Sequence, residues 1–177
     1  MATHDINPPF HHLPAIEPVE TDLPAPAGRT RVYLLPGELN ASKEPAQITT
    51  ILGSCVAVCL WDAKSGIGGM NHFLLPAWRE GEGPSTRFGD IATRTLLQKL
   101  LELGCQRRNL IAKLFGGAAL FRSQDSYIAS LGSKNVDAAR TMMKNAGIPV
   151  IAQDTGGTNG RKIVFNTDDG SAWSRQV

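Results

Sequence analysis

The sequence has few cysteines and no long apolar segment. Its three cysteines, Cys55, Cys59 and Cys105, form no CxxC pair and have no cluster of histidines around them, which argues against a disulfide framework or a zinc site. No stretch approaches the roughly 18 apolar residues of a membrane-spanning helix, and residues 1–7 lack the features of a secretion signal. We therefore expect free thiols in a reducing compartment, the cytoplasm, and no membrane insertion.

An excess of charge of one sign is also missing. The chain has 18 Lys and Arg against 16 Asp and Glu, a net charge of +2, with no basic run or stripe. Proteins that bind nucleic acid or anionic lipid through phosphate contacts need such a stripe, so neither partner is expected. The acidic residues form no group typical of a metal site or a catalytic carboxylate pair.

The apolar and charged fractions, 42% and 19% of 177 residues, are those of a globular protein with one domain. Proline is concentrated at the start of the chain. Six of the eleven prolines precede Arg29: Pro8, Pro9, Pro14, Pro18, Pro24 and Pro26. Because proline removes backbone donors and favours extended conformations, we predict a flexible N-terminal tail over residues 1–29 and a folded domain over residues 30–177.

Short apolar runs alternate with turns in the rest of the chain. They predict strands over residues 31–35, 56–61, 70–75, 110–115, 148–152 and 162–166, and an extended run approaching Leu52. Helical periodicity predicts helices over residues 90–103 and 135–145, closed by Gly104 and Gly147. This order indicates an α/β or α+β domain, and we expect the α+β form: mixed β-sheets in a sandwich-like core, flanked by two main helices.

Three glycine pairs, at residues 68–69, 116–117 and 156–157, raise the question of a nucleotide site. None has the G-x-x-x-x-G-K-[ST] spacing of a phosphate-binding loop. Glycine is common wherever the chain turns sharply, because it adopts positive φ without steric strain. We therefore predict that all three pairs form tight turns.

Only one histidine lies outside the predicted tail. His4, His11 and His12 precede Arg29, whereas His72 is in the folded part. Imidazole accepts a proton near physiological pH, so His72 is the candidate general base. The alternative is a buried histidine held by a backbone hydrogen bond, which is the more common situation.

Among the cysteines, Cys55 has the sequence context best suited to a nucleophile. It follows Gly53-Ser54 at the start of a predicted strand, where a tight turn can present backbone N–H groups that stabilise a thiolate or an oxyanion. Cys59 lies inside an apolar run and Cys105 has no base near it in sequence, so we expect both to be structural. Spacing alone leaves ordinary packing as the alternative to a Cys55–His72 pair.

Two segments resemble a known family. Residues 49–58 read T-T-I-L-G-S-C-V-A-V, and residues 68–76 read G-G-M-N-H-F-L-L-P. At this separation they resemble the CheD family of chemoreceptor glutamine deamidases. The resemblance continues through K-L-F-G-G-A at residues 113–118 and through residues 132–135 and 154–165, and it spans about residues 31–170.

The resemblance implies a catalytic triad. It makes Cys55 the nucleophile and His72 its base, and it makes Thr49, six residues before the cysteine, the group that completes the triad. The adjacent Thr50 keeps the choice of threonine open, and either residue is also typical of an ordinary β-strand. Ser54 is a candidate for binding the oxyanion.

The implied reaction is hydrolysis of a glutamine carboxamide to glutamate and ammonia through a thioester, without a metal or organic cofactor. A nearby imidazolium is expected to favour the Cys55 thiolate. The implied substrate lies on the cytoplasmic helices of chemoreceptors, and Asn71 is a further candidate for contacting the substrate or the oxyanion.

Two alternatives stay open. Transglutaminase-like acyl transfer shares the thioester, and the family's association with a CheC-type phosphatase allows a chemotaxis adaptor.

Overall fold

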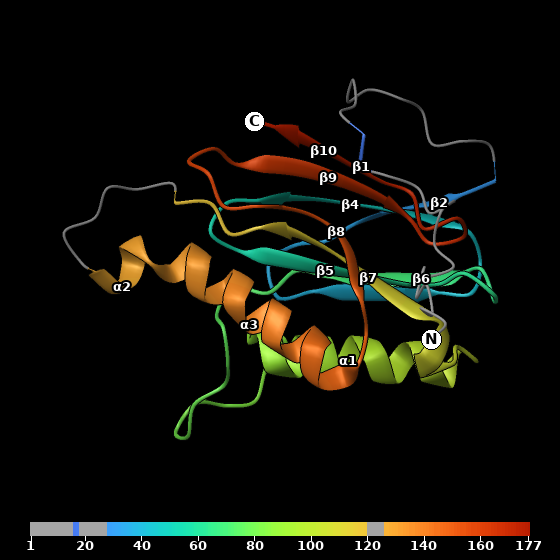
Figure 1. Ribbon diagram of the computed structural model, residues 1–177, viewed down its shortest axis with the longest axis horizontal. Helices are drawn as coiled ribbons and strands as arrows, with labels where there is room; N and C mark the ends of the chain where they lie inside the picture. The colour runs from blue at the N-terminus through green and yellow to red at the C-terminus, as the bar shows by residue number, and fades with distance from the viewer. Residues whose placement is uncertain (1–15, 18–27, 120–125) are drawn as a thin grey trace, which may run out of the picture.

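Two five-stranded sheets lie one on the other, and helices cover the outer face of the second sheet (Figure 1). The computed structural model describes residues 16–17, 28–119 and 126–177. In spatial order, the first sheet contains β1 (Ile16–Glu17), β10 (Ala172–Gln176), β9 (Arg161–Asn166), β4 (Ala46–Leu52) and β2 (Thr30–Tyr33). The second contains β3 (Leu39–Ser42), β6 (Ile67–Asn71), β5 (Val56–Asp62), β7 (Leu110–Gly116) and β8 (Val150–Thr155).

The helices are α1 (Gly89–Glu102), α2 (Ser126–Ala129) and α3 (Leu131–Ala146), with a short 3-10 helix at Arg107–Asn109. Both sheets mix parallel and antiparallel pairs. The expected α+β sandwich flanked by two main helices is therefore confirmed. None of the helices in the described part of the chain is long and apolar enough to span a membrane.

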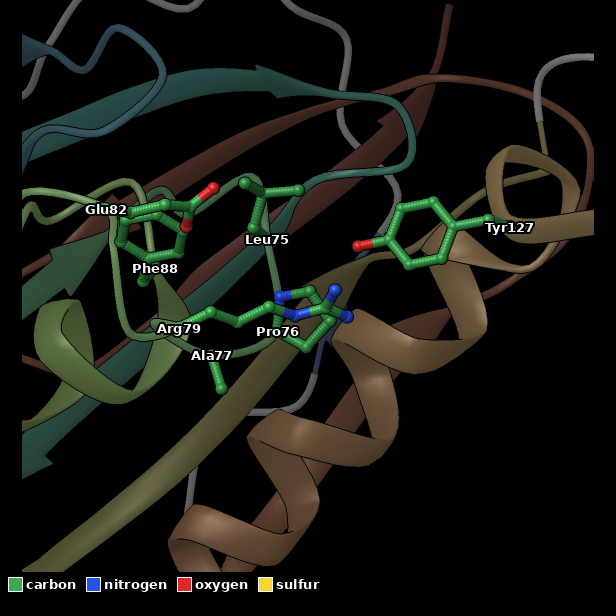
Figure 2. A pocket seen from close by; sticks show the side chains of 7 residues that line it. All are labelled: Leu75, Pro76, Ala77, Arg79, Glu82, Phe88 and Tyr127. Atoms are coloured by element: carbon green, nitrogen blue, oxygen red, sulfur yellow. The ribbon is translucent and has the colours of Figure 1, made fainter.

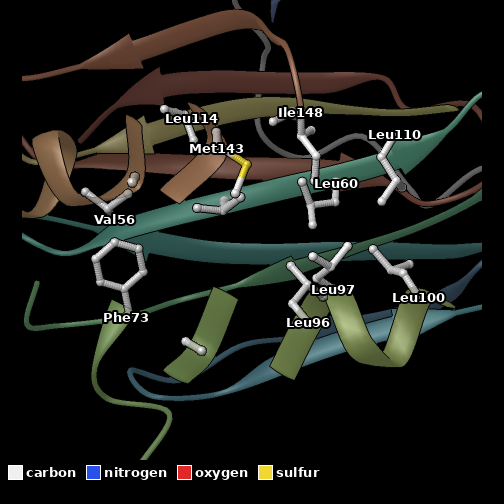
Figure 3. Close-up of a cluster of buried hydrophobic side chains, with 14 of the residues drawn as sticks. Val56, Leu60, Phe73, Leu96, Leu97, Leu100, Leu110, Leu114, Met143 and Ile148 are labelled. Carbon is white, nitrogen blue, oxygen red and sulfur yellow. The ribbon is translucent and has the colours of Figure 1, made fainter. Parts of the chain in front are cut away.

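Side chains of β5 alternate between two apolar layers, because successive strand residues point to opposite faces of a sheet. Val56, Val58 and Leu60 face α1 and α3, where they meet side chains such as Leu96 and Met143 (Figure 3). Ala57 and Cys59 face the other way, into the layer between the two sheets. The central strands of the second sheet, β6, β5 and β7, are therefore buried on both faces, and β5 is a continuous apolar run from Val56 to Trp61.

Several predicted elements are confirmed. The helix expected over residues 90–103 is α1, and the strands expected over 56–61, 110–115 and 162–166 are β5, β7 and β9. The second helix, α3, begins four residues earlier than predicted, at Leu131, and ends as expected at Gly147, which has a φ of 67°. The extended run approaching Leu52 is two strands, β3 and β4, and neither β10 nor α2 was predicted.

The strand predicted over residues 70–75 begins earlier, as β6, and ends at Asn71, with isolated bridges at Phe73 and Leu75. The turn expected at Gly68-Gly69 is wrong, because both glycines lie inside β6. A Cβ added at Gly69 would come within 2.6 Å of the Asn40 carbonyl oxygen and 2.8 Å of the Leu96 side chain. The absence of a side chain thus lets β3 and α1 approach β6 closely. Close backbone packing and tight turns both select glycine, and the sequence does not distinguish them.

Most of the predicted tail, residues 1–29, lies outside the described residues. Within it, Ile16–Glu17 pair in parallel with Ala172–Trp173 of β10. The Arg29 side chain forms ion pairs with Asp168 and Asp169, each at 2.7 Å. These parts of the segment therefore belong to the folded domain rather than to a tail.

Helix α3 packs directly on the loop after β7. A Cβ added at Gly132 would lie 2.5 Å from the Gly117 carbonyl oxygen and 2.8 Å from that of Ala118. Both atoms belong to backbone, which cannot rotate away as a flexible side chain can.

We therefore expect Gly132→Ala to destabilise the protein by about 1–3 kcal/mol, although alanine in a helix is normally preferred to glycine by about 1 kcal/mol. Gly83→Ala is the matched control, because a Cβ at that position meets nothing within 4 Å. Urea unfolding of the two variants measures the difference. A Gly132→Ala variant as stable as the wild type would show that this backbone contact is not tight.

Candidate active site

Cys55 lies in the turn between β4 and β5, with its side chain half-buried. The loop after β7 holds this turn: the Gly117 N–H donates to the Cys55 carbonyl and the Ala118 N–H to the Gly53 carbonyl, both at 2.8 Å. Gly116 and Gly117 have φ values of 104° and 71°, a backbone conformation that glycine adopts without strain. A Cβ at Gly116 would overlap the Cys55 carbonyl, so a larger residue there would displace the cysteine.

Strand pairing places His72 on the same face as Cys55. Val56 and Phe73 form an antiparallel bridge, with N–O distances of 3.1 and 3.0 Å. This register sets His72 opposite Ala57, and Cys55, which directly precedes β5, is two residues before Ala57. Diagonal neighbours on one face of an antiparallel pair lie close enough for longer side chains to meet. Cys55 also packs against the apolar layer between the sheets, as Ala57 does.

The first sheet contributes a threonine that contacts the imidazole. Thr50 Oγ1 lies 2.8 Å from His72 Nδ1 and donates its proton to the Leu34 carbonyl, also at 2.8 Å. A hydroxyl has one proton, so Thr50 must accept the second hydrogen bond from an Nδ1–H. The bond therefore favours the tautomer that leaves Nε2 with a free lone pair, which can accept a proton.

The threonine at this position is Thr50, and the structure does not bring Thr49 to the imidazole. Burial alternates along β4: Ile48, Thr50 and Leu52 are buried on the inner face, whereas Thr49 is only half-buried and points to the other face. A shift of one residue in a strand exchanges the two faces of the sheet. Of the two adjacent threonines, the resemblance implied Thr49 and left Thr50 open, and the one that contacts the imidazole is Thr50.

Burial keeps both reactive groups neutral in the free protein. It raises the pKa of the Cys55 thiol, and the residue's own backbone N–H opposes this shift. The His72 side chain is 2% exposed, and burial lowers its pKa to about 4, against the opposing effects of the Leu34 carbonyl and the Glu38 charge. Both shifts disfavour the expected thiolate–imidazolium pair and favour a neutral thiol and a neutral imidazole.

The two candidate contact residues, Ser54 and Asn71, have different surroundings. Asn71 is fully buried, accepts a hydrogen bond from the Val58 N–H at 2.8 Å and donates to Thr93 of α1 at 3.2 Å. Its side chain thus points away from His72, toward the helical layer, and its position gives no support to a role at the site. Ser54 remains beside the cysteine. Its N–H and that of Cys55 have no hydrogen-bond acceptor on another residue in the described part of the chain.

Cys59 and Cys105 are buried free thiols. Burial raises the pKa of both thiols. The nearest polar group to the Cys105 sulfur is the Ser65 hydroxyl at 3.8 Å, which is not a base. Their surroundings agree with the structural role that the sequence indicated.

Asn135 is a polar residue at the site that the sequence reasoning did not single out. It lies on α3, is fully buried, and donates hydrogen bonds to the Ser54 and Leu74 carbonyls at 2.9 and 2.8 Å. The available signal was an asparagine on the core-facing side of an amphipathic helix, where an apolar residue is normal.

A small pocket adjoins this region. It has a volume of about 130 Å³ and is lined by Leu75, Pro76, Ala77, Arg79, Glu82, Phe88 and Tyr127. Figure 2 shows Arg79 reaching toward Tyr127 of α2, and its guanidinium carbon lies 5.8 Å from the centre of the tyrosine ring. The Lys134 ammonium lies 4.3 Å from the same ring. Arg79 and Tyr127 thus line the pocket, and Lys134 contacts the same tyrosine ring.

The buried neutral imidazole makes stability depend on pH. His72 has a folded pKa of about 4 and an ordinary value of 6.5, so between these values the unfolded chain binds more protons. Stability therefore rises with pH across this window and is lost as the pH falls from about 6.5 to about 4, by on the order of 1–3 kcal/mol.

We expect His72→Gln to reduce the change of the urea midpoint between pH 4 and 6.5, because glutamine does not titrate. His11→Gln, in the predicted tail, is the control and should keep the wild-type slope. Equal slopes in the wild type and His72→Gln would mean that the imidazole is not held neutral by burial.

Comparison with known proteins agrees with the resemblance found in the sequence. A family model described as CheD chemotactic sensory transduction matches residues 74–176. The probable chemoreceptor glutamine deamidase CheD 1 of Anaeromyxobacter dehalogenans is 45% identical over 163 residues, 90% of this chain and 92% of that protein. The probable chemoreceptor glutamine deamidase CheD of Trichlorobacter lovleyi is 47% identical over 141 residues, 79% of this chain and 86% of that protein.

A similar protein also occurs in Methanococcus vannielii. Its probable chemoreceptor glutamine deamidase CheD is 40% identical over 141 residues, 79% of this chain and 91% of that protein. The family model begins two residues after His72, but an alignment over 90% of the chain necessarily includes both Cys55 and His72. The match extends over more than half of the chain and nearly the full length of the relatives, so the chain belongs to the CheD family.

Proposed function

We propose that this chain deamidates glutamine side chains of chemoreceptors, with Cys55 as nucleophile, His72 as general base and Thr50 as the group that orients the imidazole. The names of the relatives support the reaction and the substrate. The observation that carries the residue assignment is the Thr50–His72 hydrogen bond at 2.8 Å, on the face that Cys55 shares. It leaves Nε2 as the basic nitrogen.

The first step is attack of the cysteine on the glutamine carboxamide. Because the resting thiol and imidazole are both neutral, the proton passes from Cys55 Sγ to His72 Nε2 as the sulfur attacks the amide carbon. The free N–H groups of Ser54 and Cys55 are the donors available to the developing oxyanion. His72 then protonates the departing nitrogen, so ammonia leaves and a thioester remains.

The second step regenerates the thiol. His72, neutral again, takes a proton from water as the oxygen attacks the thioester carbon, and the proton then passes to the departing sulfur. The products are glutamate and ammonia, and one water molecule is consumed. Thr50 accepts the Nδ1–H throughout, and its own proton is held by the Leu34 carbonyl, so the ring keeps one orientation in both steps.

The surface beside the site suits a protein substrate. Arg79 lines the pocket together with Glu82, and the Arg79 and Lys134 cations both lie over the ring of Tyr127, which also lines it. Positive charge of this kind is complementary to a receptor surface with acidic side chains around the reacting glutamine. We assign this surface to contacts with the receptor around the reacting side chain.

Cys55→Ala is expected to abolish deamidation and to leave the fold nearly intact, since the side chain is small and half-buried. Cys105→Ser is the matched control and should retain activity. The assay is incubation with the cytoplasmic fragment of a candidate chemoreceptor, followed by mass mapping of glutamine-to-glutamate changes. Turnover by folded Cys55→Ala excludes this nucleophile, and incorporation of an added amine in place of hydrolysis identifies transglutaminase-like transfer.

The two adjacent threonines provide a second test. Thr50→Val retains shape but removes the acceptor of the Nδ1–H, and we expect kcat to fall at least about 10-fold with little change in KM. Thr49→Val is the matched control, with the same change on the other face of β4, and should remain near wild type. The opposite result would make Thr49 the third member of the triad.

A further inference from the structure

We infer that Asn135 is a positioning residue that aims the backbone N–H of Cys55 into the site. This inference rests on the proposed function, because the N–H matters only if an oxyanion forms on a carbon attacked by Cys55. Asn135 contacts neither the thiol nor the imidazole through any hydrogen bond in the described residues, so it acts through the backbone it holds.

The orientation of the Asn135 amide follows from its partners. Both neighbours are carbonyl oxygens, of Ser54 at 2.9 Å and of Leu74 at 2.8 Å, and carbonyls only accept hydrogen bonds. The group facing them must therefore be the NH₂, which has two protons for two acceptors. The Oδ1 atom is buried and has no partner among the described residues, so the two donated bonds are what this side chain contributes.

Planarity of the peptide bond transmits this contact to the cysteine. In a trans peptide the C=O of one residue and the N–H of the next point in opposite directions. Because Asn135 draws the Ser54 carbonyl toward α3, the Cys55 N–H points the opposite way. That N–H has no acceptor on another described residue, and it lies close enough to the Cys55 thiol to affect its pKa.

Asn135 is the only side chain that holds a carbonyl of this turn in the described part of the chain. The flanking carbonyls, of Gly53 and Cys55, are held by backbone N–H groups of Ala118 and Gly117. The middle carbonyl, of Ser54, is held by Asn135 alone. A substitution can therefore release one peptide plane and leave its neighbours fixed.

The second bond of Asn135 ties the cysteine turn to the histidine segment. Leu74, which accepts it, lies two residues after His72 and opposite Cys55 in the register set by the Val56–Phe73 bridge. One buried amide thus connects the backbones that position the two reactive side chains, and both connections come from α3.

The test uses Asn135→Leu, which is similar in size but cannot donate. We expect kcat to fall at least about 10-fold, because an aimed oxyanion donor acts in the transition state, with KM changed less than about two-fold. We also expect the pH–rate profile of iodoacetamide alkylation at Cys55, followed by peptide mass mapping, to shift to higher pH, since the thiolate loses an aimed N–H.

Asn166→Leu is the matched control. Asn166 is also fully buried, and its side chain donates to Ser171. It lies at the far end of β9 from Arg161, which pairs with Leu52 just before the cysteine turn. Its replacement lowers stability and should leave kcat and the alkylation profile of the folded protein unchanged. If Asn135→Leu does not fold, Asn135→Asp keeps the shape, and its kcat should fall as rising pH converts a donating acid to a carboxylate that cannot donate.

Three outcomes would overturn the inference: a wild-type kcat in folded Asn135→Leu, a lower kcat without a shift of the alkylation profile, or equal losses in Asn166→Leu. A kcat of Asn135→Asp that does not fall as the pH rises would also overturn the inference. Each of these leaves the proposed function in place as long as Cys55→Ala is inactive. Activity of Cys55→Ala instead rejects the proposed function itself.

Discussion

The hydrogen bond between Thr50 and His72 is the contact on which the site depends, because it joins the two sheets at the reactive end of the sandwich. Thr50 comes from β4 of the first sheet, and His72 directly follows β6 of the second. Thr50 donates its hydroxyl proton to the Leu34 carbonyl, so it must accept the bond from His72, and this fixes the tautomer of the ring. The same hydrogen bond therefore both links the two sheets and leaves Nε2 of His72 as the basic nitrogen.

Burial decides how such a site can react. It lowers the pKa of His72 and raises that of Cys55, so neither charge forms before substrate binds. A neutral thiol is a weak nucleophile and reacts little with small electrophiles in the cell. In the reaction that we propose, charge then develops only during attack, where the imidazole and the N–H groups of Ser54 and Cys55 are available to stabilise it. Burial of this kind limits unwanted reactions of the proposed nucleophile.

Close backbone packing gives the cysteine turn its shape. Gly116 lies against the Cys55 carbonyl, and Gly132 of α3 lies against the carbonyls of Gly117 and Ala118 in the loop after β7. A side chain at Gly116 or Gly132 would push these backbones apart. This close approach lets Asn135 reach the Ser54 carbonyl from the helix. The helical layer, which takes no direct part in the chemistry we propose, therefore fixes the backbone around the nucleophile.

The sequence by itself determined the α+β class, the two main helices, most of the strands and the Cys55–His72 candidates, because periodicity, glycine caps and the scarcity of histidine are local properties. Only the tertiary structure showed that Thr50 contacts His72, that Asn71 is directed toward the helical layer and that Asn135 binds the Ser54 carbonyl. It also placed Gly68-Gly69 inside a strand. These outcomes depend on which face a strand turns to its partner and on how closely backbones pack, and both are set by contacts between residues far apart in the chain.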